Sequence, residues 1–198
     1  GHISNAKNRL VGPKDFTSMA NSHFEEKVAR IYGPYQAALR KNNALDFDDL
    51  LMKTIELFRA HETVLNQYQE QFRYIHVDEY QDTNHAQYIL ANLLAKKYKN
   101  LCVIGDHDQS IYSWRGADIT NILDFEKDYP NAKVIKMEQN YRSTQHILDA
   151  AQAVIVKNKK RKEKTLWTEQ KGGELIKLLI AENERHEGEL VTFAIKEA

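Results

Sequence analysis

The chain has 198 residues, and its 28 Lys and Arg residues balance its 28 Asp and Glu residues, so the formal net charge is zero. This balance excludes binding of nucleic acid through a global basic field, and any site for a polyanion must be local. The 42% share of hydrophobic residues supports a packed core and excludes disorder over most of the chain. The single Cys102 excludes an intramolecular disulfide and favours a reducing, cytoplasmic location. No run of about 18 apolar residues is present, so no membrane partner is expected.

The sequence predicts that about the first 70 residues are helical. Apolar residues between Phe16 and Leu39 recur at spacings close to a helical turn, and Gly33-Pro34 is expected to break or kink this helix. A second helix is predicted to begin after Asp46, which can cap its free N–H groups. We prefer capping over a metal site for this acidic cluster. The buried face of the second helix is predicted to consist of Leu51, Ile55 and Phe58.

The middle of the chain predicts a strand–helix–strand unit. Two short β-rich runs, 72–77 and 101–105, flank a helix with an apolar face at 86–94. Both runs are typical of buried parallel strands, and both end in acidic residues. Open α/β sheets bind ligands beyond the carboxyl ends of their strands, so the sequence predicts a ligand site there.

The last third of the chain is predicted to continue the α/β pattern. The expected elements are a strand at 133–137, a helix capped by Ser143 or Thr144, a strand at 175–181 and a helix at 187–198. The inner face of the first of these helices is predicted to consist of Ile147, Leu148, Ala151, Val154 and Ile155. Residues 157–164 carry six basic side chains and one acid, which suits either a solvated helix end or a phosphate-backbone contact.

Three polar blocks follow the predicted strands. In the first, DEYQD, one carboxylate of the pair Asp78 and Glu79 can hold Mg²⁺ through water while its neighbour takes a proton from an attacking water, although such a pair is more often an ordinary strand exit. The second, GDHDQSIYSWRGA, places Tyr112, Trp114 and Arg115 in a loop with little apolar surface to fill, which favours base stacking over core packing. The third, EQNYRS, offers an aromatic ring for a nucleobase and a guanidinium for a phosphate.

Together these blocks resemble motifs II, III and IV of the UvrD/Rep/PcrA family of superfamily-1 DNA helicases, most closely its PcrA branch from Gram-positive bacteria. The flanking segments LDFDDLL and NILDFEKDYPNAKVI are also similar, so the resemblance covers essentially the whole chain. It implies an α/β fold built from pieces of RecA-like P-loop NTPase sheets. It also implies ATP and Mg²⁺ as cofactors, single-stranded and partial-duplex DNA as partners, repair or replication proteins as further partners, and a bacterial nucleoid location.

The resemblance also implies a role for individual residues. Asp78 and Glu79 would bind Mg²⁺, the former through water, and Glu79 would activate the hydrolytic water. Gln109 would sense the γ-phosphate, Tyr141 would stack on adenine and Arg142 would contact the γ-phosphate. The residues implied to bind single-stranded DNA are Tyr112, Trp114 and Arg115.

The phosphate-binding P-loop of such enzymes is absent, because none of the eight glycines is followed by lysine. The chain is therefore interpreted as an internal fragment of a 3′ to 5′ helicase that is expected to be inactive alone. By resemblance, residues 1–68 are the end of helical domain 1B and its return to domain 1A. Residues 69–131 are the later part of domain 1A, and residues 132–198 begin domain 2A.

Two other functional classes stay open at this point. A metal-dependent nuclease could use the four carboxylates of Asp78, Glu79, Asp106 and Asp108. Such an enzyme would leave the aromatic loop and the third block without a function. A non-catalytic module that binds single-stranded DNA or a protein would also suit the isolated chain. Mg²⁺-dependent cleavage of DNA without ATP would separate the nuclease from the other two.

Overall fold

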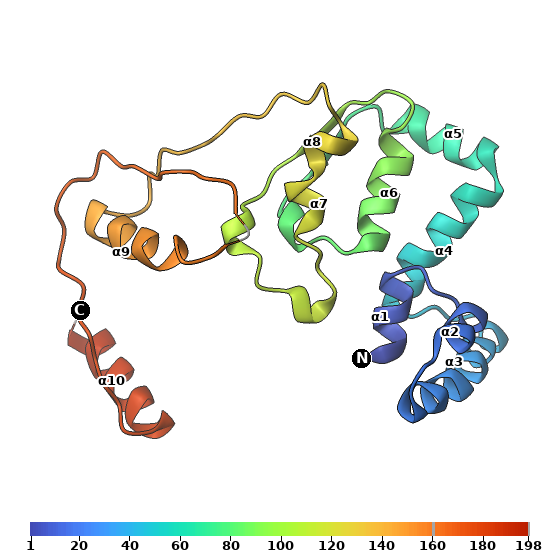
Figure 1. Ribbon diagram of the computed structural model, residues 1–198, viewed down its shortest axis with the longest axis horizontal. Coiled ribbons are helices and arrows are strands. Elements are labelled where there is room, and N and C mark those ends of the chain that lie inside the picture. The colour runs from blue at the N-terminus through green and yellow to red at the C-terminus, as the bar shows by residue number, and fades with distance from the viewer. Residues whose placement is uncertain (160, 198) are drawn as a thin grey trace. The chain divides into compact units, whose positions relative to one another are not determined.

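The computed structural model describes residues 1–159 and 161–197, which divide after residue 133 into two compact units. The helices of the first unit are α1 (His2–Asn8), α2 (Pro13–Met19), α3 (His23–Lys41), α4 (Phe47–Ala60), α5 (Glu62–Gln71), α6 (His85–Ala95), α7 (Thr120–Leu123) and α8 (Phe125–Asp128) (Figure 1). Its strands are β1 (Ile75–Val77) and β2 (Leu101–Val103), and its 3-10 turns are η1 (Tyr80–Asp82), η2 (His107–Gln109) and η3 (Ser113–Arg115). The described part of the second unit contains α9 (Gln145–Ile155) and α10 (Glu184–Glu197).

Helix α3 runs without interruption through Gly33 and Pro34, so the predicted break there is wrong. Proline removes one helical hydrogen bond and crowds the preceding turn. Tyr32 and Gln36, on the two sides of Pro34, are both buried. Packing of both turns therefore outweighs the hydrogen bond that Pro34 cannot donate.

Helix α4 begins as predicted. The Asp46 carboxylate accepts from the backbone N–H of Asp49 at 2.8 Å, and the Asp49 carboxylate accepts from the Asp46 N–H at 3.5 Å, which forms a capping box. Leu51 is only half-buried, because it lies at the side of the face that packs inward. The buried apolar residues of α4 are Met52, Ile55 and Phe58.

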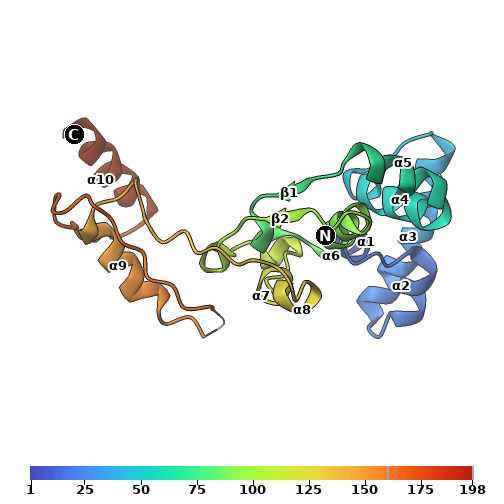
Figure 2. The same cartoon turned by 90° about the horizontal axis from the view of Figure 1, so that it is seen from above.

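The predicted strand–helix–strand unit is confirmed in the first unit. Strands β1 and β2 pair in parallel with Ile75 opposite Leu101, and α6 packs against β1 and also against α4 (Figure 2). Both strands are shorter than predicted, since only three residues of each form the ladder. Two further hydrogen bonds extend it past the strand ends, from Ile104 N to Val77 O and from Tyr80 N to Ile104 O. The first unit is thus an α/β structure with a small parallel sheet.

The strands predicted at 133–137 and 175–181 are wrong. In the described part of the second unit, the pairing found is one isolated parallel bridge between Gln139 and Trp167. A strand needs a neighbour for its backbone hydrogen bonds, and no segment of the described chain pairs with either run. Their apolar side chains are accordingly exposed, as Met137 and Leu178 illustrate at 83% and 84%.

Helix α9 begins after Thr144, as predicted, but the Thr144 side chain makes no capping hydrogen bond. Of its predicted inner residues, only Leu148 is buried, whereas Ile147, Ala151 and Val154 are exposed because little of the described unit packs against them. Helix α10 begins at Glu184, three residues earlier than predicted, and its predicted end at residue 198 lies outside the described residues, as does Lys160 of the basic run. No helix in the part of the chain that the structure describes combines the length and apolar character needed to cross a membrane.

Candidate functional site

The first acidic block lies where β1 ends. Asp78 and Glu79 follow Val77 directly, and both side chains are exposed. The Asp78 carboxylate accepts from the Glu79 N–H at 2.9 Å. Because the ladder continues through Tyr80 to β2, the two carboxylates are held at the carboxyl edge of the sheet. This is the place in which the sequence predicts a ligand site.

Glu79 has an unusual backbone conformation. Its φ of 49° and ψ of 41° place it in the left-handed region, which residues other than glycine adopt infrequently. This conformation turns the chain sharply from β1 into η1. The Glu79 carboxylate then accepts a hydrogen bond of 2.7 Å from the side-chain amide of Gln81. Such backbone conformations concentrate at functional sites, where the surrounding structure holds them in place.

Gln81 joins the first block to the second. Its side chain is 1% exposed, and its amide oxygen accepts from the backbone N–H of Asp106 at 2.9 Å. Its backbone carbonyl accepts from the Ser110 hydroxyl at 3.3 Å. The sequence analysis did not single out Gln81. The available signal was a polar side chain two residues after a candidate catalytic carboxylate.

Gly105 makes room for Gln81. A Cβ at position 105 would lie 2.5 Å from the amide oxygen of Gln81 and 2.9 Å from Cδ1 of Ile122. Real Cβ atoms essentially never approach so closely, so a larger residue would displace one of these neighbours. The requirement for glycine therefore comes from close approach rather than from backbone dihedrals.

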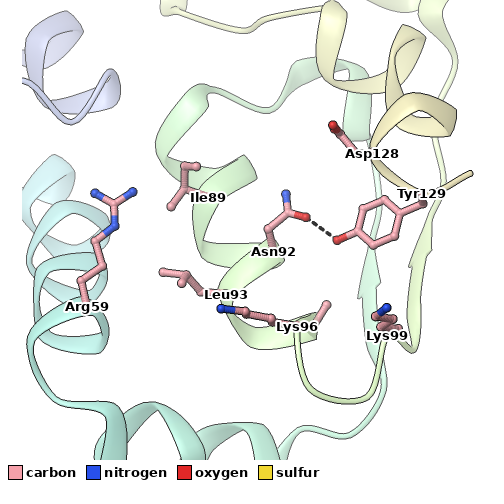
Figure 3. Close-up of a pocket in the computed structure, with 9 residues that line it drawn as sticks. Arg59, Ile89, Asn92, Leu93, Lys96, Lys99, Asp128 and Tyr129 are labelled. Carbon is pink, nitrogen blue, oxygen red and sulfur yellow. Dashed lines mark hydrogen bonds between the residues drawn. The ribbon is translucent and has the colours of Figure 1, made fainter.

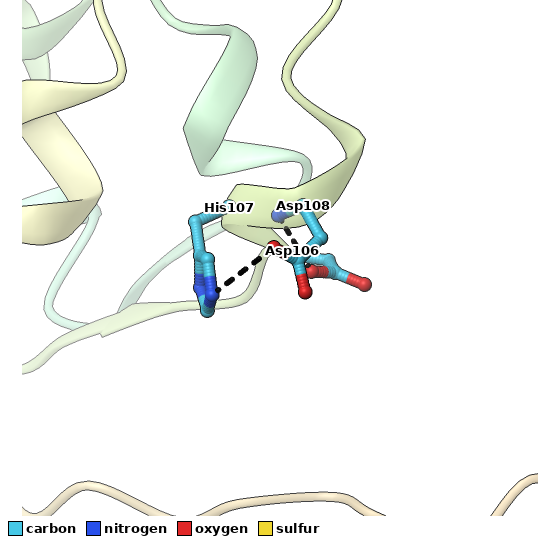
Figure 4. Close-up of side chains that lie close together, drawn as sticks. All are labelled: Asp106, His107 and Asp108. Carbon is cyan, nitrogen blue, oxygen red and sulfur yellow. Dashed lines mark hydrogen bonds and ion pairs between the residues drawn. The ribbon is translucent and has the colours of Figure 1, made fainter. Parts of the chain in front are cut away.

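The second block forms η2 around Asp106 (Figure 4). The Asp106 carboxylate accepts from the Asp108 N–H and from the Gln109 side-chain amide, both at 2.9 Å. His107 Nε2 lies 3.6 Å from an oxygen of Asp108. Asp106, His107 and Asp108 each offer one possible metal-ligand atom, and these three atoms all lie within 4.8 Å of one another. Among the residues that the structure describes, neither Asp78 nor Glu79 belongs to a metal-ligand group. The four carboxylates of the nuclease alternative therefore do not form one cluster.

The aromatic loop at η3 is exposed. Trp114 is 69% exposed, which contradicts a core-filling role, and the Tyr112 ring lies 6.4 Å from it. The Arg115 guanidinium lies 4.6 Å from the Trp114 ring centroid and 5.3 Å from that of Tyr112. A cation over two exposed rings offers both stacking surface and a phosphate contact.

Hydrogen bonds tie the end of this loop to the first block. Gly116, with a φ of 92°, turns the chain, and the Asp118 N–H then donates to the Thr83 carbonyl at 3.0 Å. The buried Asn121 amide donates to the same carbonyl at 3.0 Å and to the Thr83 hydroxyl at 3.1 Å. The acidic pair and the aromatic loop are thus anchored to one framework. Sequence patterns gave no signal for Thr83 or Asn121.

The third block lies in the second unit. The Asn140 side chain accepts from the Arg142 N–H at 3.0 Å, and the Tyr141 hydroxyl donates to the Gln139 side chain at 2.8 Å. The Tyr141 ring is 74% exposed, and Arg142 is exposed as well. Both predicted nucleotide-binding side chains therefore stand at the surface of this unit.

The cavity between α4, α6 and α8 lies apart from these residues (Figure 3). It measures about 330 Å³, and its lining includes Arg59, Lys96 and Tyr129. The Tyr129 hydroxyl donates to the side chain of Asn92 there. Burial, with a hydrogen bond to Asp128, raises the pKa of the nearby Tyr88 to about 12. No described residue of the three blocks lines this cavity, so it is not part of the candidate site.

Comparison with family models covers both units. Residues 1–130 match the UvrD/REP helicase N-terminal domain, and residues 135–198 match the UvrD-like helicase C-terminal domain. The chain belongs to the UvrD/REP helicase family. The resemblance inferred from the three blocks is thereby confirmed.

Individual members of the UvrD/REP family are similar over nearly the whole chain. The ATP-dependent DNA helicase PcrA of Leuconostoc citreum is 54% identical over 100% of the chain, and that of Bacillus subtilis is 57% identical over 96%. The PcrA helicase of Staphylococcus epidermidis is 58% identical over 96%. The chain spans 26% of the length of each of these curated relatives.

Proposed function

We propose that the chain is part of an ATP-dependent DNA helicase that couples ATP hydrolysis to 3′ to 5′ movement along single-stranded DNA and to duplex unwinding. The observation that carries this proposal is that an exposed carboxylate pair and an exposed cation–aromatic loop share one framework at the carboxyl edge of a parallel sheet. The similarity to helicases named as ATP-dependent supports it further.

The residues at the end of β1 suit Mg²⁺-dependent hydrolysis. Asp78 and Glu79 present exposed carboxylate oxygens, which are the ligands that Mg²⁺ prefers. Bound Mg²⁺ would neutralise charge on the phosphates. Glu79, held by Gln81, would accept the proton of the attacking water.

Three further residues would contact the bound nucleotide. The Gln109 amide, oriented by Asp106, would contact the γ-phosphate and report its presence. In the second unit, the exposed Tyr141 ring would stack on adenine and the Arg142 guanidinium would contact the γ-phosphate.

The loop at η3 would bind DNA. Bases would stack on Tyr112 and Trp114 without preference for sequence, because every base has a π-face. Arg115 would contact the phosphate backbone. ATP-driven changes around Gln109 would then alter the grip of this loop on the strand.

The proposal extends to the architecture of the longer protein. Residues 1–68 would return from domain 1B, 69–131 would complete RecA-like domain 1A, and 132–198 would begin RecA-like domain 2A. A cytoplasmic, nucleoid-associated location and repair or replication partners would follow from this activity. The bacterial origin of the related helicases supports a bacterial location.

A hybrid enzyme tests the function. The 198 residues replace the matching segment of the Bacillus subtilis relative, and ATP hydrolysis is measured with and without single-stranded DNA. We expect DNA-stimulated hydrolysis that Glu79→Gln abolishes while binding of a fluorescent ATP analogue persists, because the amide keeps the shape but cannot accept the proton. Absence of DNA stimulation, or DNA cleavage that needs Mg²⁺ but no ATP, would contradict the proposal. The isolated chain, which lacks a P-loop, should not hydrolyse ATP at a comparable rate.

A further inference from the structure

We infer that Gln81 is a positioning residue that couples the carboxylate of Glu79 to the loop carrying Gln109 and the DNA-binding aromatic residues. The inference rests on the proposed function, because it assigns Gln81 a task in ATP hydrolysis. It concerns a side chain that would touch neither nucleotide nor DNA.

The amide nitrogen of Gln81 sets the direction of the Glu79 carboxylate. It donates to Glu79 Oε2 at 2.7 Å and lies 3.4 Å from an oxygen of Asp82. Gln81 is 1% exposed, whereas Glu79 is exposed and would otherwise sample many rotamers. A buried donor therefore fixes an exposed acceptor, as general-base catalysis requires.

The amide oxygen of Gln81 connects to the second block. It accepts from the Asp106 N–H at 2.9 Å, and the Asp106 carboxylate accepts from the Gln109 amide at 2.9 Å. Hydrogen bonds thus connect Glu79 to the Gln81 side chain and the Gln81 side chain to the backbone of Asp106. The side chain of Asp106 then continues the path to Gln109. The Ser110 hydroxyl adds a second link by donating to the Gln81 carbonyl.

The orientation of the Gln81 amide follows from its neighbours. The Glu79 carboxylate oxygen accepts here, and the backbone N–H of Asp106 can only donate. A rotated amide would place oxygen against oxygen on one side and N–H against N–H on the other. No other side chain of this length offers a neutral donor and an acceptor together, and close contact at Gly105 leaves little space for adjustment.

A displacement of Glu79 or of Gln109 is therefore transmitted to the other residue through these hydrogen bonds. A movement of Gln109 toward a γ-phosphate would pull on Asp106, and through Gln81 on the carboxylate that accepts the proton. Binding of DNA at η3 would act along the same path through Ser110. The expected property is dependence of the hydrolysis step on DNA, with little effect on nucleotide affinity.

The first test uses Gln81→Met in the hybrid helicase described above. Methionine keeps the length and removes both hydrogen bonds. We expect the kcat of DNA-stimulated hydrolysis to fall about 10-fold to 100-fold, as for other residues that orient a catalytic group, with the KM for ATP within about twofold. Gln69→Met is the matched control, because Gln69 is 4% exposed and its amide donates to the Leu93 carbonyl away from the site. Its kcat should stay within about twofold of the parent.

The second test uses Gln81→Asn. Asparagine keeps the amide donor and acceptor, but its side chain is one methylene shorter and cannot reach Glu79 and the Asp106 N–H together. Its kcat should therefore fall as that of Gln81→Met does, while the KM for ATP stays within about twofold of the parent.

The outcomes separate the two proposals. If the parent hybrid shows no DNA-stimulated hydrolysis, the proposed function is wrong and the inference is wrong with it. If the parent is active, the inference is overturned when Gln81→Met retains its kcat, or when it loses no more than Gln69→Met. It is also overturned if Gln81→Asn keeps the kcat of the parent. Thermal unfolding of each variant shows that the compared proteins are folded.

Discussion

The ammonium group of Lys7 lies 2.6 Å from a carboxylate oxygen of Asp46, although 39 residues separate them. It also lies 3.0 Å from an oxygen of Asp49, and the Lys7 side chain is fully buried. Tyr35 adds a hydrogen bond of 2.8 Å to Asp46. One buried cation thus pairs with both carboxylates of the capping box and joins α1 to the start of α4.

Replacing Lys7 by methionine should destabilise the first unit. The change keeps the length of the side chain but leaves the Asp49 carboxylate, 1% exposed, without its cation. Breaking a buried ion pair from one side costs about 3–5 kcal/mol. Urea unfolding of the chain checks this value. The exposed Lys27→Met on α3 serves as control, and equal effects of the two substitutions would contradict a stabilising function of the buried pair.

Because of the Asp46 carboxylate, the free energy of unfolding should depend on pH in the acid range. Burial acts to raise its pKa, but hydrogen bonds from Lys7, the Asp49 N–H and Tyr35 outweigh burial, so the pKa lies below the ordinary 3.8. The stabilisation is therefore present above about pH 4 and is lost as the pH falls through the lowered pKa.

Asp46→Asn retains a good capping residue, and it removes the charge together with the acceptor oxygen that faces Lys7 and Tyr35. At neutral pH it should lower the free energy of unfolding by about 1–3 kcal/mol. This difference from the parent should shrink as the pH falls below about 4. Asp15→Asn, at an exposed position in α2, provides the control. A difference that is independent of pH would argue against the charge of Asp46.

Removing the Trp114 ring should weaken DNA binding without unfolding the protein. A stacked ring contributes about 1–3 kcal/mol per base, and a side chain that is 69% exposed contributes little to the core. Fluorescence anisotropy with a labelled oligothymidine measures the affinity of the hybrid helicase, and calorimetry measures its melting temperature. Phe47→Ala removes a ring that is 90% exposed on α4 and should change neither. A large drop in melting temperature for Trp114→Ala would indicate a structural ring.

Arg115 should contribute to the salt dependence of DNA binding. Loss of one phosphate contact on a single strand reduces the slope of log K against log salt by about 0.7. We expect this change for Arg115→Ala. Arg115→Lys should keep the slope but bind more weakly, because lysine loses the planar contact with Trp114. An unchanged slope for Arg115→Ala would place the guanidinium away from phosphate.

A methyl group at Gly105 should disturb the site. The added Cβ would collide with Gln81 and Ile122, and overpacking of this kind costs about 1–3 kcal/mol. Gly33→Ala is a control for which we expect an effect of opposite sign. Its Cβ would meet no atom within 4 Å, and the residue lies inside α3. That change should stabilise the chain by about 0.5–1 kcal/mol. Urea unfolding of both variants checks the sign of each effect, and tolerance of Gly105→Ala would refute the close approach.

Local sequence determined much of the first unit. The cap at Asp46 and the strand–helix–strand unit at 75–103 follow from neighbouring residues and from short-range periodicity. The order of the acidic, aromatic and Tyr141-Arg142 blocks was enough to identify the family. Each of these signals depends on residues that lie close together in the chain.

Tertiary structure alone decided the rest. Gln81 meets Asp106 across 25 residues and Lys7 meets Asp46 across 39, and no local pattern encodes such contacts. The runs 133–137 and 175–181 show that a local pattern is not sufficient to form a strand. Their apolar composition predicts strands, but a strand forms only where another segment satisfies its backbone hydrogen bonds, and the described residues provide none for them. Long-range partners therefore decide both which polar side chains are buried and which apolar segments become strands.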